Sequence, residues 1–356
     1  MAVLNEEQEM LRDMAREWTT NESPVSEFRK VRAGGSDEAF DRKAYATMAE
    51  MGWVGVVIPE EHGGSDFGWL SAGLVVEELG KTLTASPLVA STIAAAAILL
   101  GGSEEQQAKW LPGLASGEII GTLAIAEGPR HDPAKLETTV SGGKLSGTKA
   151  FVHEAHGADL FVVAAKDGLY LVEKGEGVSL STRKLTDQRS HAEVTFDGAA
   201  ADRLAGGGDS LLDDVLDRAR ILTACEMLGM AQAVFDSTMD YLKQRVQFNQ
   251  VLATFQALQH RMADLFGDLA MMRSAVEGGL QALDSGFGVA RAATIAKAEA
   301  NRVLHTVSRE GVQLHGGMGM TDEYDVGFYL KRARVLEASF GSTSFLKNRF
   351  ATIGGY

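Results

Sequence analysis

The sequence has little of several residue types, and each shortage excludes some structures or functions. A single cysteine, Cys225, in 356 residues excludes an internal disulfide and a cysteine-based metal site, and it is typical of a reducing cytoplasm. Basic residues number 34 against 48 acidic ones, so the formal net charge of −14 argues against a nucleic-acid partner, which favours a basic surface. A few local arginines can still hold a polyanionic cofactor.

Long apolar runs are also missing. The apolar run Ala90–Gly101 has only about half the length of a membrane span, so it predicts a buried helix and no membrane partner. Glu6, Glu7 and Glu9 stand where a signal peptide needs an apolar core, so we expect no signal peptide and a cytoplasmic location. The residues that are present, 45% hydrophobic and 23% charged, are typical of an ordinary soluble globular protein.

The pattern of apolar and turn residues changes along the chain, which predicts an α+β fold of successive domains. Residues 1–118 carry apolar side chains at helical spacing and predict an N-terminal α-helical domain. Residues 119–205 hold short β-prone runs separated by Gly, Asp and Lys turns, which predicts a small middle β-barrel or β-sandwich domain. Residues 206–356 predict a C-terminal antiparallel four-helix bundle.

Helix limits follow from capping residues and breakers. Asn5 and Ser103 each precede acidic residues, so each is predicted to cap the start of a helix. The second of these helices is predicted to end at Pro112 and Gly113, because proline and glycine interrupt helices. The long C-terminal helices are predicted at Asp209–Val246, Ala253–Ser285 and Val289–Leu314.

Several local strings stand in an informative order. The string YLKQRVQFN at Tyr241–Asn249, followed by Phe255-Gln256, is similar to the Arg-x-Gln-Phe-Gly…Phe-Gln signature of the acyl-CoA dehydrogenase family. The string QLHGGMG at Gln313–Gly319 is similar to its Gln-x-x-Gly-Gly-x-Gly loop. Further strings look like its N-terminal helical domain: Met51–Gly64, Glu77–Gly80 and Gly102–Gly117.

The resemblance implies a reaction and its requirements. Members of the family bind FAD, remove an α-proton from an acyl-CoA thioester with a carboxylate, and pass the β-hydride to flavin N5. The protein supplies the base, the orientation and hydrogen bonds to the thioester carbonyl. Each of these requirements can be sought in the sequence.

The catalytic base is missing from both positions that the family uses. Most members have a Glu that follows a Tyr near the C-terminus, and the matching residues here are Phe340 and Gly341. A minority carry the Glu on a long helix one residue before an Arg, and that pair here is Ala219-Arg220. Neither glycine nor alanine accepts a proton, so we expect no catalytic residue at either position.

Other polar residues near these positions have two interpretations. Glu337, one helical turn before Gly341, and Asp217 are candidates for a relocated base, but solvated helix residues are the preferred interpretation of both. Arg220 matches a family Arg near the CoA portion or the carbonyl of the substrate, which implies substrate binding. The alternative is a salt bridge from Arg220 to Asp213 or Asp217 on the same helix.

The residues that would serve this chain's own flavin are also replaced. The family's Thr-Glu-Pro-x-Ala-Gly-Ser-Asp segment corresponds to Ala126–Asp132 (AEGPRHD), which lacks the Thr and the Gly-Ser pair. The family's Trp-Ile-Thr is Phe151-Val152-His153, so a bulky imidazole replaces a small donor. Phe345 stands where the family usually has a Gln, and Thr343 alone is kept.

The strings that reach into a neighbouring subunit's FAD in this family survive. Arginine supplies a planar, permanently charged donor set that matches diphosphate oxygens, and glycine lets the backbone approach closely. Asn249 replaces the usual Gly, and retention for packing alone is the competing explanation. The resemblance assigns these cofactor contacts: Arg245, Gln247, Phe248, Gln313, Gly316 and Gly317.

These losses and retentions together predict the non-catalytic subunit of a heteromeric enzyme. The chain resembles in this respect the heteromeric acyl-CoA dehydrogenases that actinobacteria use on CoA thioesters of sterol side chains. The expected partner is a homologous subunit that carries the catalytic Glu, in an α2β2 complex with FAD shared between the chains. The substrate is expected to be an acyl-CoA, with the CoA ester of a steroid side chain as one candidate, and the expected electron acceptor is electron-transfer flavoprotein. Two alternatives stay open: an active homomeric enzyme with a relocated base, and a non-redox acyl-CoA-binding or scaffold protein.

Overall fold

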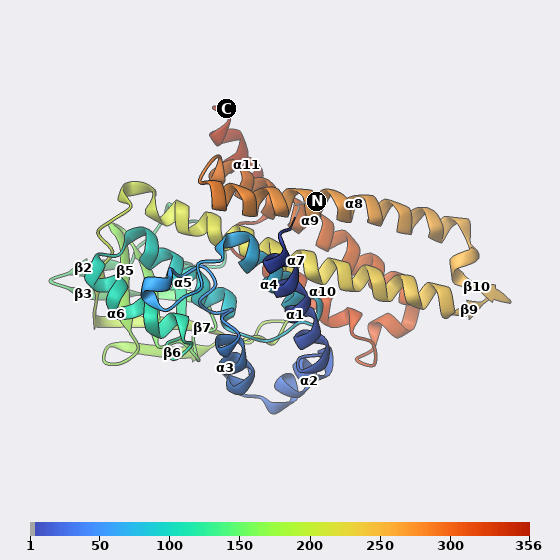
Figure 1. Cartoon of the computed structure of the whole chain (residues 1–356), viewed down its shortest axis with the longest axis horizontal. Helices are drawn as coiled ribbons and strands as arrows, with labels where there is room; N and C mark the ends of the chain where they lie inside the picture. Colours follow the sequence, from blue (N-terminus) through green and yellow to red (C-terminus); the bar gives the residue numbers. More distant parts are fainter. Residues whose placement is uncertain (1–3) are drawn as a thin grey trace. The chain divides into compact units, whose positions relative to one another are not determined.

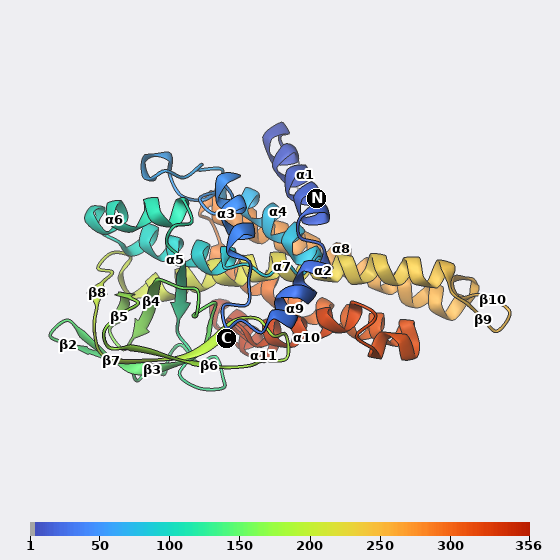
Figure 2. The ribbon, with the colours of Figure 1, turned by 90° about the horizontal axis from the view of Figure 1, so that it is seen from below.

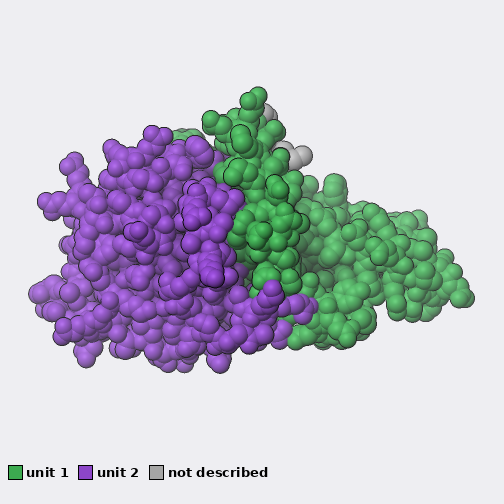
Figure 3. Space-filling model, turned by 60° about the horizontal axis from the view of Figure 1, so that its bottom comes forward, with its two compact units in different colours: residues 1–27, 73–84, 220–356 green, residues 28–72, 85–219 purple. Residues whose placement is uncertain are grey.

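The computed structural model describes residues 4–356 (Figure 1). The chain divides into two compact units, coloured separately in Figure 3. The first comprises residues 1–27, 73–84 and 220–356, and the second comprises residues 28–72 and 85–219. The division cuts three helices, α2, α4 and α7, so each of them contributes to both units.

Helices fill the N-terminal third of the chain. The predicted capping residues are confirmed, because the side chains of Asn5 and Ser103 accept hydrogen bonds from the backbone N–H groups of Gln8 and Gln106 in capping boxes. The helices are α1 (Glu6–Asn21), α2 (Val25–Gly34), α3 (Arg42–Glu50), α4 (Gly68–Lys81), α5 (Leu88–Gly101) and α6 (Glu104–Ala115).

Helix α6 does not end where the sequence predicts. It continues through Pro112 and Gly113 to Ala115, so the predicted stop is wrong. The added turn buries Leu114 and Ala115, and the carbonyl of Pro112 still accepts a hydrogen bond from the N–H of Ser116 at 3.0 Å. Burial of apolar side chains therefore outweighs the helix-breaking tendency of proline here.

The predicted buried helix over the apolar run is confirmed. Helix α5 is buried along nearly its whole length. Within residues 4–356, every helix is too short or too polar to cross a membrane.

The strands form two four-stranded sheets within the second unit. One sheet has the order β1-β4-β5-β8, with β1 parallel to β4, and the other is antiparallel with the order β2-β3-β7-β6. Phe161 on β4 meets Phe196 on β7 edge to face at 5.9 Å, so aromatic side chains link the two sheets. The strands are β1 (Gly121–Ala124), β2 (Thr139–Ser141), β3 (Lys144–His153), β4 (Leu160–Ala165), β5 (Gly168–Glu173), β6 (Val178–Thr182), β7 (His191–Ala200) and β8 (Asp202–Arg203).

Long helices return in the C-terminal part, where α7 to α10 run alternately in opposite directions (Figures 1 and 2). A short hairpin of β9 (Val246–Gln247) and β10 (Gln250–Val251) joins α7 to α8. The prediction that the first long helix reaches Val246 is therefore wrong. The helices are α7 (Leu211–Gln244), α8 (Gln256–Ser285), α9 (Val289–His315), α10 (Val326–Ala338) and α11 (Thr343–Ile353).

Within the first unit, α4 and α7 approach each other closely enough to require glycine. A Cβ on Gly229 would lie 1.9 Å from the carbonyl oxygen of Glu77, and one on Gly80 would lie 2.3 Å from that of Glu226. Neither backbone can yield without breaking helix hydrogen bonds. These two glycines thus set the separation of the helices.

Candidate functional site

The turn between α10 and α11 holds the family's base position in a shape that crowds and strains a side chain. Phe340 has a φ of 57° and Gly341 a φ of 128°, a region that favours glycine. A Cβ on Gly341 would lie 2.9 Å from Cδ1 of Phe345 and 3.3 Å from Cδ2 of Leu346. Phe345 and Leu346 thus occupy the space into which a side chain at position 341 would project.

Arg220 is bound to this same turn. Its side chain is fully buried, at 0% exposure, and its Nε donates a hydrogen bond to the carbonyl oxygen of Phe340 at 3.0 Å. Its guanidinium carbon lies 5.8 Å from the centre of the Phe345 ring. The predicted substrate-binding arginine therefore stabilises the turn at the base position, while Ala219 beside it on α7 is also buried.

A second buried cation, which the sequence analysis missed, supports the turn from α9. Lys297 is fully buried, and its Nζ donates to Oδ1 of Asn301 at 2.6 Å and to the carbonyl oxygen of Leu336 at 2.9 Å. Nδ2 of Asn301 in turn donates to the carbonyl oxygen of Gly341 at 3.3 Å. Burial lowers the pKa of Lys297 to about 7. The sequence does carry a signal for this buried lysine, because Lys297 and Asn301 fall on the apolar face of α9. That face also holds Ala293, Ala300 and Leu304.

The two candidates for a relocated base both have local charge partners. Arg334 donates a hydrogen bond to Glu337 at 2.9 Å and another to Nδ1 of His305 at 2.9 Å. Asp217 is buried on α7, where its charge acts on Arg218. These surroundings suit structural ion pairs.

The segment that replaces the family's flavin-binding loop is tied down by its own glutamate. The Glu127 carboxylate accepts hydrogen bonds from Nζ of Lys149 at 2.6 Å and from Oγ1 of Thr138 at 2.6 Å. Burial by itself would raise the pKa of Glu127, but these hydrogen bonds outweigh burial and lower it to about 2. Glu127 therefore anchors the loop to the sheet. As a carboxylate it has no hydrogen to donate to a ligand.

Strand β3 is irregular where the family has its flavin-covering Trp-Ile-Thr. The pairing with β7 shifts between Lys149 and Val152, and Phe151 has a φ of 54°. The ring of His153 lies 4.6 Å from that of His191. The bulge keeps an unusual backbone at this position while an imidazole pair fills the space beside it.

The β9–β10 hairpin presents the retained Arg-x-Gln-Phe string to solvent. Arg245, Gln247 and Phe248 are all exposed, with Phe248 at 83%. Phe248 and Asn249 form the two-residue turn with φ values of 55° and 64°. Asparagine is the side chain that best tolerates this conformation, so Asn249 preserves a turn for which the family uses glycine.

The second retained string is Gln313–Gly319. Stacked aromatic rings connect it to the end of α7, where the hairpin begins. Tyr241, one helical turn before Arg245, stacks on His315 with ring centres 4.4 Å apart. Gly316 follows at the end of α9 with a φ of 61° and a ψ of −141°, and a Cβ on Gly316 or Gly317 would have no atom within 4 Å. The loop thus offers open, exposed backbone close to the base of the hairpin.

These exposed groups fit part of a dinucleotide cofactor. Arg245 is a permanent cation on the surface, and among residues 4–356 it enters no ion pair that would consume its donors. Exposed glycine backbone beside it can approach phosphate oxygens. The arrangement can bind an anion, but it contains no group that abstracts a proton.

Comparison with known proteins decides the family. Residues 5–118 match the model of the acyl-CoA dehydrogenase N-terminal domain, and residues 206–353 match that of the acyl-CoA dehydrogenase C-terminal domain. The chain belongs to the acyl-CoA dehydrogenase family. The expected α+β fold of that family, helices followed by a middle β region and long helices, is confirmed. Acyl-CoA dehydrogenases are flavoprotein oxidoreductases whose members bind FAD.

Individual acyl-CoA dehydrogenases resemble this chain along nearly its whole length. Acyl-CoA dehydrogenase IpdE2 of Mycobacterium tuberculosis is 32% identical over 92% of this chain and 91% of its own. The structure of a variant of the Tcur3481-Tcur3483 steroid ACAD is 31% identical with a TM-score of 0.92, covering 98% of both chains. A chain of the ChsE4-ChsE5 complex from M. tuberculosis, 24% identical, shares the fold with a TM-score of 0.89 over 100% of this chain and 98% of that chain. The expected resemblance to actinobacterial steroid acyl-CoA dehydrogenases is thus confirmed.

Proposed function

We propose that this chain is the non-catalytic subunit of a heteromeric FAD-dependent acyl-CoA dehydrogenase. One observation carries the proposal: Gly341, at the family's base position, lies in a turn where Phe345 crowds any side chain, whereas Arg245 stands exposed on the hairpin. A chain that closes its own site and keeps the contacts for a neighbour's cofactor needs a different neighbour. That neighbour carries the catalytic Glu and the flavin ring.

In this proposal the exposed strings hold the distal half of the partner's FAD. Arg245 binds the diphosphate, Gln313 and the backbone of Gly316 and Gly317 complete its contacts, and Phe248 with Gln247 packs near the adenosine. FAD supplies the redox chemistry when bound. This chain orients the cofactor through its charge and its backbone, and it moves no proton.

The comparisons support the choice of partner and substrate class. The name Tcur3481-Tcur3483 joins two proteins in one steroid ACAD, and it belongs to a structure very similar to this chain. We therefore propose an α2β2 complex that acts on an acyl-CoA, with a steroid side-chain CoA ester as the preferred candidate. Electron-transfer flavoprotein is the proposed acceptor and the cytoplasm the proposed location. We also propose domains at residues 1–118, 119–205 and 206–356, although the two compact units divide the chain elsewhere.

The main alternative is a homomeric enzyme with a relocated base, and mutation of the candidate bases distinguishes it from the proposal. If Glu337 were the base of a homomeric enzyme, this chain purified alone would oxidise acyl-CoA, and Glu337→Gln would lower that turnover by on the order of 1,000-fold. We expect instead that this chain alone has no turnover and that turnover of the complex stays within about twofold in Glu337→Gln, because Glu337 pairs with Arg334 and His305 and partly exposed pairs contribute about 1 kcal/mol or less. Steady-state assays of acyl-CoA oxidation on this chain alone and on the purified complex measure the difference, and Asp217→Asn provides the same test for the second candidate.

A further inference from the structure

A small pocket in the second unit lies between the end of α2 and the loop that joins β6 to β7. Its lining comes from residues 31–39 on one side and residues 182–191 on the other. Its volume is about 240 Å³, below the roughly 300–1,000 Å³ of pockets that enclose drug-sized ligands. The pocket therefore suits a small ligand.

Hydrogen bonds between the two walls fix the shape of the pocket. Nε of Arg32 on α2 donates to Oε1 of Gln188 at 2.8 Å. Oγ of Ser190 donates to the carbonyl oxygen of Asp37 at 2.8 Å. Both bonds join segments that are about 150 positions apart in the sequence. A ligand thus meets a preformed site, and its binding energy is not spent on ordering the two segments.

Positive charge dominates the lining of this pocket. Four of its lining residues are arginine or lysine, and Asp37 is the one acidic residue among them. The whole chain has 48 acidic and 34 basic residues, so the local excess of positive charge is opposite to the overall composition. A concave surface of one charge concentrates ions of the other charge. The four cationic side chains are Arg32, Arg183, Lys184 and Arg189.

Two of these cations are available to a ligand. Lys184 is exposed and forms no ion pair with any residue in 4–356. Arg183 pairs with Glu193 at 2.5 Å, but the two side chains are 45% and 31% exposed, and such pairs are weak. The guanidinium of Arg183 also has further N–H donors. Arg189 differs, because it is buried and its Nη2 donates to Oε1 of Glu154 at 2.9 Å.

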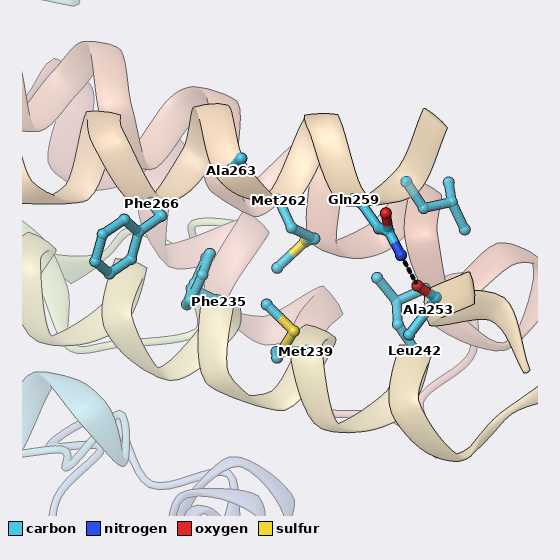
Figure 4. Close-up of a pocket in the computed structure, with 9 residues that line it drawn as sticks. Phe235, Met239, Leu242, Ala253, Gln259, Met262, Ala263 and Phe266 are labelled. Carbon is cyan, nitrogen blue, oxygen red and sulfur yellow. Dashed lines mark hydrogen bonds between the residues drawn. The ribbon is translucent and has the colours of Figure 1, made fainter. Parts of the chain in front are cut away.

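The charged lining distinguishes this pocket from the apolar groove between α7 and α8 in the first unit. That groove has a volume of about 520 Å³, and Figure 4 shows Met239 of α7 facing Met262 of α8 across it. Its polar lining residue, Gln259, donates to the carbonyl oxygen of Ala253 at 2.8 Å, as the dashed line in Figure 4 shows. The lining of the groove holds no charged side chain, so an ionic ligand has no partner there.

We propose that the pocket between α2 and the β6–β7 loop binds a phosphate group. The guanidinium of Arg183 and Nζ of Lys184 bind its oxygens, since arginine offers a planar donor set to phosphate and lysine a point charge. The exposed hydroxyl of Ser36 donates a further hydrogen bond from the opposite wall. A phosphate group carries about −1.5 to −2 charge near pH 7, which two cations balance. A single carboxylate would leave one of them uncompensated.

Titration calorimetry of the full chain with inorganic phosphate, at constant ionic strength, tests the proposal. We expect saturable binding that Lys184→Gln weakens about tenfold, because the variant loses a charge-assisted hydrogen bond. Lys144→Gln is the matched control. Lys144 is an exposed lysine of the same unit at the start of β3, outside the pocket lining, so its loss should change the affinity by less than about twofold.

Two results of this titration would overturn the proposal. One is the absence of saturable heat up to about 10 mM phosphate, a concentration that excludes all but the weakest binding. The other is equal affinity of wild type and Lys184→Gln. Both lysines are exposed, so neither substitution should disturb the fold.

Asp37→Asn tests the charge of the ligand with an effect of the opposite sign. Removing the one carboxylate of the lining removes a repulsion, so phosphate should bind about threefold more tightly at low salt. The gain should shrink as added salt screens the charges. An affinity for phosphate that falls or stays the same in Asp37→Asn would contradict an anionic ligand.

Two further probes identify the source of the phosphate group. Glycerol 3-phosphate that displaces inorganic phosphate would show that the pocket accepts a monoester, and failure to displace it would restrict the ligand to the free ion. Malonate that binds more tightly than phosphate would make the ligand a dicarboxylate and overturn the proposal. The pocket shares no residue with the proposed FAD contacts, so either outcome leaves the proposed function unaffected.

Discussion

Replacing Arg245 by alanine is expected to lower the affinity of the heteromeric complex for FAD by on the order of 100-fold, because charge-assisted hydrogen bonds to phosphate contribute about 1.5–3 kcal/mol each. The side chain is exposed and unpaired with any carboxylate of residues 4–356, so its removal should leave the fold of this chain unchanged. The yellow colour of the complex should fade on dialysis. Flavin fluorescence of the released cofactor measures the loss.

Two further variants make the Arg245 result specific. Arg245→Lys keeps the charge but loses the planar fork, so its FAD affinity should lie between wild type and alanine. Arg291→Ala removes an exposed arginine from the opposite end of α9, and FAD affinity should not change. If Arg245→Ala keeps its full flavin content, the trans contact is wrong and the scaffold alternative gains support.

Restoring the missing acid with Gly341→Glu is expected to destabilise the chain without giving it activity. A φ of 128° is strained for a side chain, at about 1–3 kcal/mol, and overpacking against Phe345 adds about 1–3 kcal/mol more. The free energy of unfolding should therefore fall by about 2–6 kcal/mol. Chemical denaturation of wild type and variant, followed by circular dichroism, measures the change.

The contact with Phe345 supplies the control for Gly341→Glu. The double variant Gly341→Glu with Phe345→Gln restores two family residues and removes the ring that a Cβ would meet at 2.9 Å. It should recover part of the lost stability, because neighbouring changes are not additive. Acyl-CoA oxidation by the single variant, with wild-type stability, would show that only the acid was missing and that the site is otherwise intact.

Features that depend on a few neighbouring residues were predictable from the sequence. The capping boxes at Asn5 and Ser103 need only side chains within one helical turn, and the buried helix α5 needs only its apolar run. The stop at Pro112 failed because tertiary burial overrode a local breaker. The hairpin was missed because Phe248-Asn249 lacks the glycine that marks such turns.

Features that join distant residues were not predictable from one sequence. Lys297 lies 39 positions from the carbonyl of Leu336 that it caps, and Tyr241 lies 74 positions from the carbonyl of His315 that its hydroxyl meets. Family resemblance identified position 341 as the place of the lost base. It did not reveal that Phe345 fills the adjoining space, which distinguishes a closed site from one that has lost a single residue.

The central claim is that this chain holds half of a cofactor site and its partner holds the other half. The direct measurement is the molar ratio of FAD to protein in the purified complex, from flavin absorbance and quantitative amino-acid analysis, beside the same ratio for this chain expressed alone. The account predicts one FAD for each pair of unlike chains and none for this chain alone. A homo-oligomer of this chain that carries one FAD per chain and oxidises acyl-CoA would contradict it.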